Sequence, residues 1–280
     1  MCLLASWTLG SLVFLHPDFN QDVFVFNNDI RWVYCCVRAI SKDKLFVFSS
    51  LFFYGMIREM QTEHFLTKDD YTIAADYYAG TGKSGVLLLH MMPADRTSWH
   101  ALAAKLQENG FHILAIDLRG HGQSTGGPNG YQAFSDAQHQ QSVFDVDSAV
   151  EFLRSKGAEK IHIGGASIGA NLGLQYAAKH SEVASVVLLS PGLDYCGIHT
   201  DIWMDNIKPN QAILLVASDD DVYSFTTVKT LFDRSSNLPM WEVKLLTEAG
   251  HGTVILQKNP GFIDEIVVWL KKVDSRPTTQ

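Results

Sequence analysis

The chain has 280 residues, 46% of them hydrophobic, which is enough to fill one large core without a second independently folding domain. A formal net charge of −8 leaves no basic face for a phosphate backbone, so the composition argues against nucleic-acid binding and favours a neutral or apolar small molecule as substrate. The 4 cysteines lack C-x-x-C spacing and the histidines lack the spacing of a zinc site, so we expect no metal, no cofactor and a reducing, cytoplasmic compartment.

The first 59 residues differ in composition from the rest of the chain. They are dense in Phe, Trp, Cys and Leu and show no helical or alternating period. Their longest apolar run, Leu45 to Ile57, is shorter than the roughly 18 to 20 residues that span a bilayer, and no signal-peptide pattern precedes it. We therefore predict that residues 1–59 are an extension or a mis-called upstream start, and that residues 60–280 form the working domain. Basic residues beside the apolar run leave a peripheral membrane anchor as the weaker alternative.

From residue 63 the chain alternates apolar and polar positions, which predicts a β-hairpin over residues 63–78. Uninterrupted apolar runs then recur, and strands that are apolar on both faces are typical of a parallel sheet with helices on both sides. These runs are residues 85–90, 111–117, 160–165, 184–190, 212–218 and 241–246. Segments of helical period lie at 99–109, 136–156, 171–179 and 262–272. The alternation predicts an α/β fold, a doubly wound and mostly parallel sheet with the hairpin as its antiparallel edge.

Two Gly-x-Ser-x-Gly patterns compete for the role of nucleophile, and only one has the right context. A nucleophile elbow needs a strand, a sharp turn with the serine at its tip, and then a helix. Ser167 lies between a predicted strand and a predicted helix, and its flanking glycines let the two backbones approach closely. Ser124 follows a loop and runs into Gly127 and Pro128, which end regular structure, so we assign it to a surface loop. Ser167 is therefore the predicted nucleophile.

A serine hydroxyl needs a base to accept its proton and an acid to orient that base. Of the 11 histidines, His251 stands apart because it lies on a glycine-flanked loop after the last predicted strand. Catalytic loops emerge at that edge of an open α/β sheet. The acid is expected after the preceding strand, where Asp219, Asp220 and Asp221 are adjacent, and Asp194, one strand earlier, is the reserve candidate.

At this point the sequence resembles the α/β-hydrolase fold superfamily over residues 62–272. Five motifs agree with that family in order: "VLLLHMMPADRTSW", "AIDLRGHGQS", "GGASIGA", "VASDDDVYS" and "EAGHGT". Aligning the acid loop with the family pattern, with Ser224 at the family's proline position, selects Asp220. The resemblance thus implies a triad of Ser167, Asp220 and His251, in the chain order of α/β-hydrolases.

The same resemblance implies an oxyanion hole made by the backbone N–H groups of Met92 and Ile168. The family usually has glycine at the position of Met91, so we expect backbone strain there if the position needs a positive φ. The segment between the strands that end near Ser190 and begin near Ala212 is too short for a multi-helix cap, which predicts an open site.

Four side chains are proposed as pocket walls, namely Met91, Trp99, Tyr195 and Trp203. The nearest resemblance is to dienelactone-hydrolase-like and small bacterial carboxylesterase groups, and it implies a serine esterase that acts on short-chain acyl esters through an acyl-enzyme. A thioesterase, a peptidase or a lysophospholipase would use the same triad, and a non-catalytic binding protein is the alternative of a different class.

Overall fold

The computed structural model describes residues 59–235 and 240–276, together with strands of the N-terminal part. The chain divides into two compact units, Met1–Arg58 and Glu59–Gln280. In the first unit an antiparallel sheet has the order β1-β2-β3-β4, with β1 at Trp7–Thr8, β2 at Ser11–Leu15, β3 at Asp22–Asn27 and β4 at Ile30–Cys36. No regular element is predicted from the sequence of these residues, and that prediction is wrong for the residues in β1 to β4. The apolar run at 45–57 lies outside the described residues, and its role stays a prediction.

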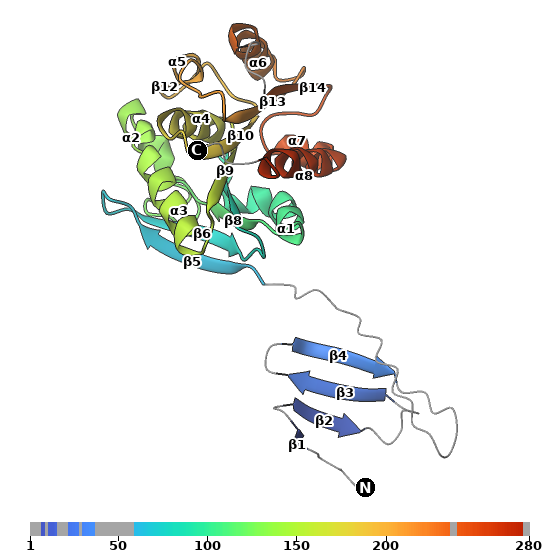
Figure 1. Cartoon of the computed structure of the whole chain (residues 1–280). Helices are drawn as coiled ribbons and strands as arrows, with labels where there is room; N and C mark the ends of the chain where they lie inside the picture. The colour runs from blue at the N-terminus through green and yellow to red at the C-terminus, as the bar shows by residue number, and fades with distance from the viewer. Residues whose placement is uncertain are drawn as a thin grey trace. The chain divides into compact units, whose positions relative to one another are not determined.

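The second unit is built on an eight-stranded sheet of described residues, with the order β14-β13-β10-β9-β7-β8-β6-β5 (Figure 1). All neighbours from β14 to β8 pair in parallel, whereas β6 and β5 run antiparallel at one edge. The strands are β5 (Gln61–Leu66), β6 (Thr72–Tyr78), β7 (Ser84–Leu89), β8 (His112–Ile116), β9 (Lys160–Ala166), β10 (Val183–Leu189), β13 (Ala212–Ser218) and β14 (Trp241–Leu246). The predicted fold class and the antiparallel hairpin at the edge are confirmed.

Helices cover both faces of this sheet (Figure 1). The apolar sides of α3, α4 and α6 pack on one face, and those of α1, α7 and α8 pack on the other. The helices are η1 (Arg96–Trp99), α1 (His100–Glu108), η2 (Gly130–Ala133), α2 (Asp136–Gln140), α3 (Val143–Ser155), α4 (Ile168–Lys179), α5 (Thr200–Met204), α6 (Val222–Ser235), α7 (Val254–Lys258) and α8 (Gly261–Asp274). The predicted helix 136–156 is interrupted between α2 and α3. Helix α6 is not predicted from the sequence, because its first turns contain β-branched residues of low helix propensity.

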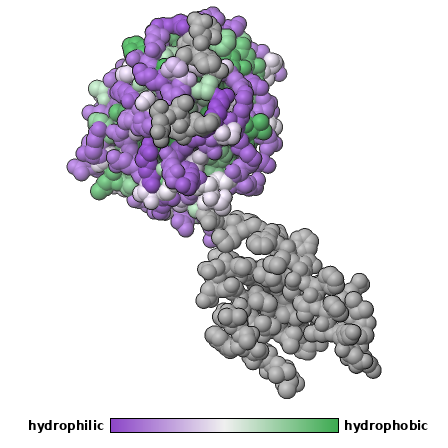
Figure 2. All heavy atoms as spheres, in the orientation of Figure 1, coloured by the Kyte–Doolittle hydropathy of each residue, from purple (hydrophilic) through white to green (hydrophobic). Residues whose placement is uncertain are grey.

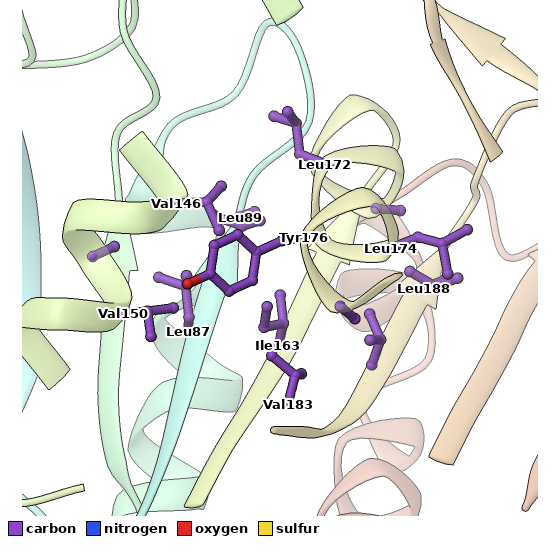
Figure 3. Packing of buried hydrophobic residues seen from close by; sticks show 14 of the residues in the cluster. Leu87, Leu89, Val146, Val150, Ile163, Leu172, Leu174, Tyr176, Val183 and Leu188 are labelled. Atoms are coloured by element: carbon purple, nitrogen blue, oxygen red, sulfur yellow. The ribbon is translucent and has the colours of Figure 1, made fainter. Parts of the chain in front are cut away.

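The core beneath α3 and α4 consists of aliphatic side chains around one tyrosine ring (Figure 3). Leu87 of β7 and Ile163 of β9 rise from the sheet toward Val150 of α3, and the Tyr176 ring of α4 lies among them. Leu87 and Ile163 are both 0% exposed. Because protein interiors pack as densely as organic crystals, the loss of one branched side chain here leaves a cavity.

The face of the described part that Figure 2 shows is mostly hydrophilic, with small and separate apolar areas. The large apolar side chains that are exposed are scattered over β5, α5, α6, β14 and α8. Single exposed apolar side chains are normal on a protein surface. Within the described ranges, no helix combines the length and the hydropathy needed to cross a bilayer.

The segment between β10 and β13 carries only small elements. A two-stranded antiparallel hairpin, β11 (Asp194–Tyr195) and β12 (Ile198–His199), is followed by α5. All residues of this segment are described, and they form no multi-helix cap. The hairpin and α5 are thus the regular elements of this segment.

We expect Leu87→Ala to lower the free energy of unfolding by about 2 to 5 kcal/mol, because the lost methyl groups leave a cavity between β7, β9 and α3. Val268→Ala, on the exposed side of α8, should change it by less than about 0.5 kcal/mol. Urea unfolding followed by tryptophan fluorescence measures both values. Equal effects of the two substitutions would contradict this assignment of the core.

Candidate active site

Ser167 occupies the tight turn between β9 and α4. Its backbone has φ 53° and ψ −121°, a conformation that is costly for a residue with a side chain. The Ser167 amide donates a hydrogen bond of 2.9 Å to the Leu189 carbonyl, which ties the turn to the end of β10. The residue is 8% exposed. The structure therefore places the predicted nucleophile in the strand, turn and helix context that the sequence indicates.

The glycines on either side of Ser167 are required by the close approach of other backbone atoms. A Cβ atom on Gly165 would lie 2.2 Å from the Gly169 carbonyl oxygen. A Cβ atom on Gly169 would lie 2.4 Å from the Leu89 carbonyl oxygen. Side-chain atoms cannot approach a backbone so closely, so only glycine fits at both positions. The turn is thereby packed against the end of β7 as well as against α4.

The order in which successive strands are added to the sheet reverses between β7 and β9, beside the Ser167 turn. From β7 it passes to β8 on one side, whereas β9, β10, β13 and β14 lie on the other side. The loop after β7 leads to α1 on one face, and the turn after β9 leads to α4 on the opposite face. In open α/β sheets, ligands bind in the crevice at such a point, beyond the carboxyl ends of the strands.

His251 is hydrogen-bonded to Asp221 and not to the predicted Asp220. Its Nδ1 atom lies 2.6 Å from Asp221 Oδ2, so the imidazole donates a short hydrogen bond to that carboxylate. Asp220 accepts instead from the Gly250 amide at 2.9 Å and from Lys258 Nζ at 3.4 Å. The prediction of Asp220 as the partner of His251 is therefore wrong by one residue.

The physical reason for this correction is that Asp221 is the N-cap residue of α6. Its carbonyl oxygen accepts from the Phe225 amide at 2.9 Å, and its Oδ1 accepts from the Ser224 amide at 3.4 Å. One carboxylate oxygen thus caps the helix while the other holds the imidazole. Aspartate is a preferred N-cap residue, so recognising α6 in the sequence would have selected Asp221.

The four residues from Ser218 to Asp221 each bind the loop that carries His251. The pairs are Ser218 Oγ with the Ala249 amide (2.7 Å), Asp219 with the Glu248 amide (2.9 Å), Asp220 with the Gly250 amide (2.9 Å) and Asp221 with the His251 ring (2.6 Å). The reserve candidate Asp194 does not bind this loop, and its carboxylate accepts a hydrogen bond from the Gly197 amide at 2.7 Å. The run of acids is therefore an interlock between the loops after β13 and β14.

Asp221 is ionised and sets the tautomer of His251. Burial acts to raise the pKa of Asp221, but the hydrogen bonds from His251 and Ser224 outweigh burial and hold that pKa below its ordinary value. An ionised carboxylate only accepts hydrogen bonds, so the His251 proton resides on Nδ1. Nε2 is left as the basic nitrogen of the ring.

The His251 loop is held against the Ser167 turn through neighbouring residues. The Gly252 amide donates to Ser190 Oγ at 2.9 Å, and Ser190 directly follows the residue that accepts the Ser167 amide. A Cβ atom on Gly252 would lie 3.5 Å from the Cβ atom of Ala166. Gly252 follows His251 in the chain, and Ala166 precedes Ser167. The close approach of Gly252 and Ala166 therefore brings the loop of the predicted base next to the turn of the predicted nucleophile.

His90 fixes the peptide between Met91 and Met92. The Leu118 amide donates to His90 Nε2 at 3.0 Å, so the ring proton is on Nδ1, which donates to the Met91 carbonyl at 2.9 Å. Burial lowers the pKa of His90, which keeps the ring neutral. In a trans peptide the C=O and N–H bonds point in opposite directions, so the Met92 N–H points away from His90. Met91 does not have a positive φ, and the strain expected there is absent.

A buried ion-pair network anchors the loop after β7. Arg96 Nε lies 2.9 Å from Asp76 Oδ1, the Arg96 guanidinium also binds Asp117, and the Arg96 amide donates to Asp117 Oδ1 at 2.8 Å. His100 Nε2 lies 3.0 Å from the second oxygen of Asp76. Arg96, Asp76 and Asp117 are all buried. Breaking such a network would leave an unpaired buried charge, so the loop is firmly held.

Met91 and Tyr195, two of the predicted pocket walls, lie at the site. A Cβ atom on Gly252 would fall 2.5 Å from Met91 Sδ, so this side chain packs beside the histidine loop. The Tyr195 hydroxyl lies 3.4 Å from Ser224 Oγ, and the Ser224 amide is bonded to Asp221, the partner of His251. Burial raises the pKa of Tyr195, so its hydroxyl remains protonated.

The two tryptophans predicted as pocket walls lie elsewhere, and those predictions are wrong. Trp99 ends η1, is 1% exposed and packs in the core on the α1 face of the sheet. The Trp203 ring, on α5, lies 4.7 Å from Lys179 Nζ. Lys179 is the last residue of α4, which Ser167 precedes, so about 18 Å of helix separates the two positions.

Ser124 is buried, in contrast to the surface position predicted for it. Its Oγ donates to the Asp117 carbonyl at 2.6 Å and accepts from the Ala74 amide at 2.9 Å. The residue is 3% exposed. Its hydroxyl therefore links the turn after β8 to β6, and the second Gly-x-Ser-x-Gly pattern is structural.

The elements around the Ser167 turn carry a hydroxyl on Ser167, an imidazole on His251 that is held by the Asp221 carboxylate, and backbone amides after β7 and at the start of α4. Such a set can move a proton from the hydroxyl to the imidazole and place a developing oxyanion beside amide donors. Within residues 59–235 and 240–276, no group of three His, Cys, Asp or Glu side chains is arranged to hold a metal ion.

Comparison with known proteins identifies the same fold. The profile of a family described as alpha/beta hydrolase fold matches residues 86–242. Lipase 1 of Psychrobacter immobilis is 31% identical over 141 residues, which are 49% of this chain and 41% of that protein. Monoacylglycerol lipase abhd6-A of Xenopus laevis is 31% identical over 127 residues, which are 42% of this chain and 35% of that protein. The chain thus spans less than half the length of these two lipases.

Solved structures give the same result. The Pyrococcus furiosus esterase Pf2001 superposes with a TM-score of 0.65 at 18% identity, over 76% of this chain and 92% of that one. A dienelactone hydrolase from Anabaena variabilis superposes with a TM-score of 0.62 at 15% identity, over 76% of this chain and 97% of that one. At such identities the likeness shows a shared fold.

The pairing of His251 with Asp221 predicts a proton NMR resonance well downfield of the amide region, from the Nδ1 proton in its short hydrogen bond. Asp221→Asn should abolish this resonance, because a neutral amide oxygen forms a weaker hydrogen bond than a carboxylate. Asp220→Asn is the matched control and should leave the resonance in place. A resonance that Asp220→Asn removes and Asp221→Asn spares would reverse the assignment.

Proposed function

Because this chain belongs to the α/β-hydrolase fold family, we propose that it is a serine hydrolase that cleaves carboxylic esters through an acyl-enzyme intermediate. The observation that carries the proposal is the hydrogen-bonded pair of His251 and Asp221 next to the strained Ser167 turn. The names of the two lipases that the chain resembles support an ester as the substrate.

In the proposed first half-reaction, the Ser167 oxygen attacks the ester carbonyl carbon while His251 Nε2 takes the hydroxyl proton. Asp221 stabilises the imidazolium that forms. His251 then gives the proton to the departing alcohol, and the acyl group stays on Ser167. In the second half, water attacks the acyl carbon as His251 takes its proton, and the carboxylic acid leaves when that proton returns to Ser167.

We propose the backbone amides of Met92 and Ile168 as the oxyanion donors. Ile168 is the first residue of α4, so its amide has no carbonyl partner within the helix and lies at the positive end of the helix dipole. The hydrogen bond from His90 to the Met91 carbonyl supports Met92, because it directs the next N–H away from His90. One such donor contributes about 3 to 4 kcal/mol of transition-state stabilisation.

The surroundings of the site favour a small, uncharged substrate. Only a short hairpin and α5 separate β10 from β13, so no multi-helix cap encloses a long acyl chain. The net charge of −8 and the acidic loop after β13 disfavour anions. We therefore propose a short-chain acyl ester as substrate and no nucleic-acid partner.

We expect Ser167→Ala to lower kcat for p-nitrophenyl butyrate at least about 10³-fold, the order of magnitude for removal of a triad nucleophile. Asp221→Asn should lower kcat by about 10³- to 10⁴-fold, because the imidazole loses its orienting charge. Asp220→Asn, one residue earlier and exposed, should stay within about threefold of the wild type.

The wild-type protein should hydrolyse p-nitrophenyl acetate and butyrate with a higher kcat/KM than the octanoate and palmitate esters. Circular dichroism of each variant checks that the fold is retained. Ester hydrolysis that survives Ser167→Ala, or a wild type that turns over none of these esters, would overturn the proposed function.

A further inference from the structure

Tyr195 places a phenol hydroxyl beside the proposed nucleophile. The residue lies on β11, in the hairpin that follows β10. Its hydroxyl oxygen is 3.4 Å from Ser224 Oγ, and the Ser167 side chain is near enough to act on the pKa of the phenol, which burial raises overall. The acylation and deacylation steps described above leave this hydroxyl without a role. A polar group so close to the reacting centre can contact a bound substrate.

Contacts on several sides hold the Tyr195 ring in place. A Cβ atom on Gly192 would lie 2.6 Å from the ring, so the ring rests directly on the backbone there. The Tyr223 ring packs edge-on with a centroid distance of 5.7 Å, and its hydroxyl accepts from the Asp194 amide and donates to the Asp194 carbonyl. Asn171 of α4 binds both the amide and the carbonyl of Gly192. A hydroxyl fixed in this way loses little entropy when it binds a ligand.

The order of the strands places Tyr195 across Ser167 from the proposed oxyanion donor. β13, β10, β9 and β7 are consecutive in the sheet, and Ser167 follows β9. Met92 follows β7 on one side, whereas Tyr195 follows β10 and Asp221 follows β13 on the other. An ester carbon bonded to Ser167 with its oxygen toward Met92 therefore directs its other substituents toward Tyr195 and His251.

We propose that, within the ester hydrolysis proposed above, Tyr195 donates a hydrogen bond to the leaving-group oxygen and so makes the site selective for alkyl oxygen esters over thioesters. When the tetrahedral intermediate collapses, the bond from the acyl carbon to the alcohol oxygen breaks, and its electron pair stays on that oxygen. His251 supplies the proton that this oxygen takes up. Tyr195 keeps its own proton, and its hydrogen bond strengthens as negative charge develops. Sulfur is a weak acceptor, so a thioester gains little from this donor.

Two further features suit Tyr195 to this role. Burial and the nearby charge of Asp221 both raise the pKa of Tyr195, so the phenol stays protonated and remains a hydrogen-bond donor. Ser224, in the first turn of α6, is 0% exposed and its hydroxyl is oriented toward the phenol. Ser224 is therefore a positioning residue for Tyr195.

Tyr195→Phe removes the hydroxyl and keeps the ring. We expect kcat/KM for ethyl butyrate to fall about 10- to 100-fold, the range for losing a hydrogen bond to a charged oxygen, and kcat/KM for S-ethyl thiobutyrate and p-nitrophenyl butyrate to change less than about threefold. The p-nitrophenolate ion is a good leaving group without a hydrogen-bond donor. p-Nitrophenyl butyrate is therefore the oxygen ester that serves as the matched control substrate. The loss should lie in kcat, because the oxygen gains charge only in the transition state.

Tyr176→Phe, which removes a phenol hydroxyl in the core on α4, is the matched control and should leave all three rates unchanged. Ser224→Ala should show the selective pattern of Tyr195→Phe with a smaller amplitude, and it carries the test if Tyr195→Phe does not fold. A uniform loss with all three substrates, or no loss with ethyl butyrate, would overturn the role of Tyr195 while the Ser167 chemistry stands. Turnover that is independent of Ser167 would instead overturn the proposed function, and the role of Tyr195 with it.

Discussion

The close approach of β9 and α4 at Ser167 is the constraint on which the rest of the site depends. Glycine at 165 and 169 lets the helix start directly against the strand and against the end of β7. The serine between them is forced to φ 53° and ψ −121°, which costs about 1 to 3 kcal/mol. Sheet pairing and the bond from the Ser167 amide to the end of β10 offset that cost. The favourable free energy of folding thereby holds a strained turn that places the Ser167 hydroxyl at the crevice between β7 and β9.

The loops around this turn are interlocked, and each supports a different chemical requirement. His90 and Arg96 fix the loop after β7, where a donor for an oxyanion is needed. The acidic loop after β13 binds the histidine loop after β14 at consecutive positions, so the imidazole has one orientation. The hairpin after β10 brings Tyr195 to the remaining side. Preorganised groups of this kind stabilise developing charge without reorganising during the reaction.

The strands, the antiparallel edge and the Ser167 turn could be predicted because burial on both faces of a strand, and the backbone contacts at Gly165 and Gly169, restrict the residue types allowed there. The partner of His251 could not be predicted from motif spacing alone. Which aspartate binds His251 depends on where α6 begins. The β-branched residues of α6 have low helix propensity, so the start of this helix cannot be predicted from the sequence. The positions of Trp99, Trp203 and Ser124 depend on tertiary packing rather than on any local pattern. Ser124, for example, lies in a loop and is nevertheless 3% exposed.

Covalent labelling with a fluorophosphonate, followed by mass spectrometry of the peptides, tests most directly whether the fold activates Ser167. We predict one adduct, on the peptide that contains Ser167, and none on the peptide that contains Ser124. The rate of labelling should fall strongly in Asp221→Asn and hardly at all in Asp220→Asn. A folded protein that forms no adduct at Ser167, or that labels Ser124 equally, would contradict this account.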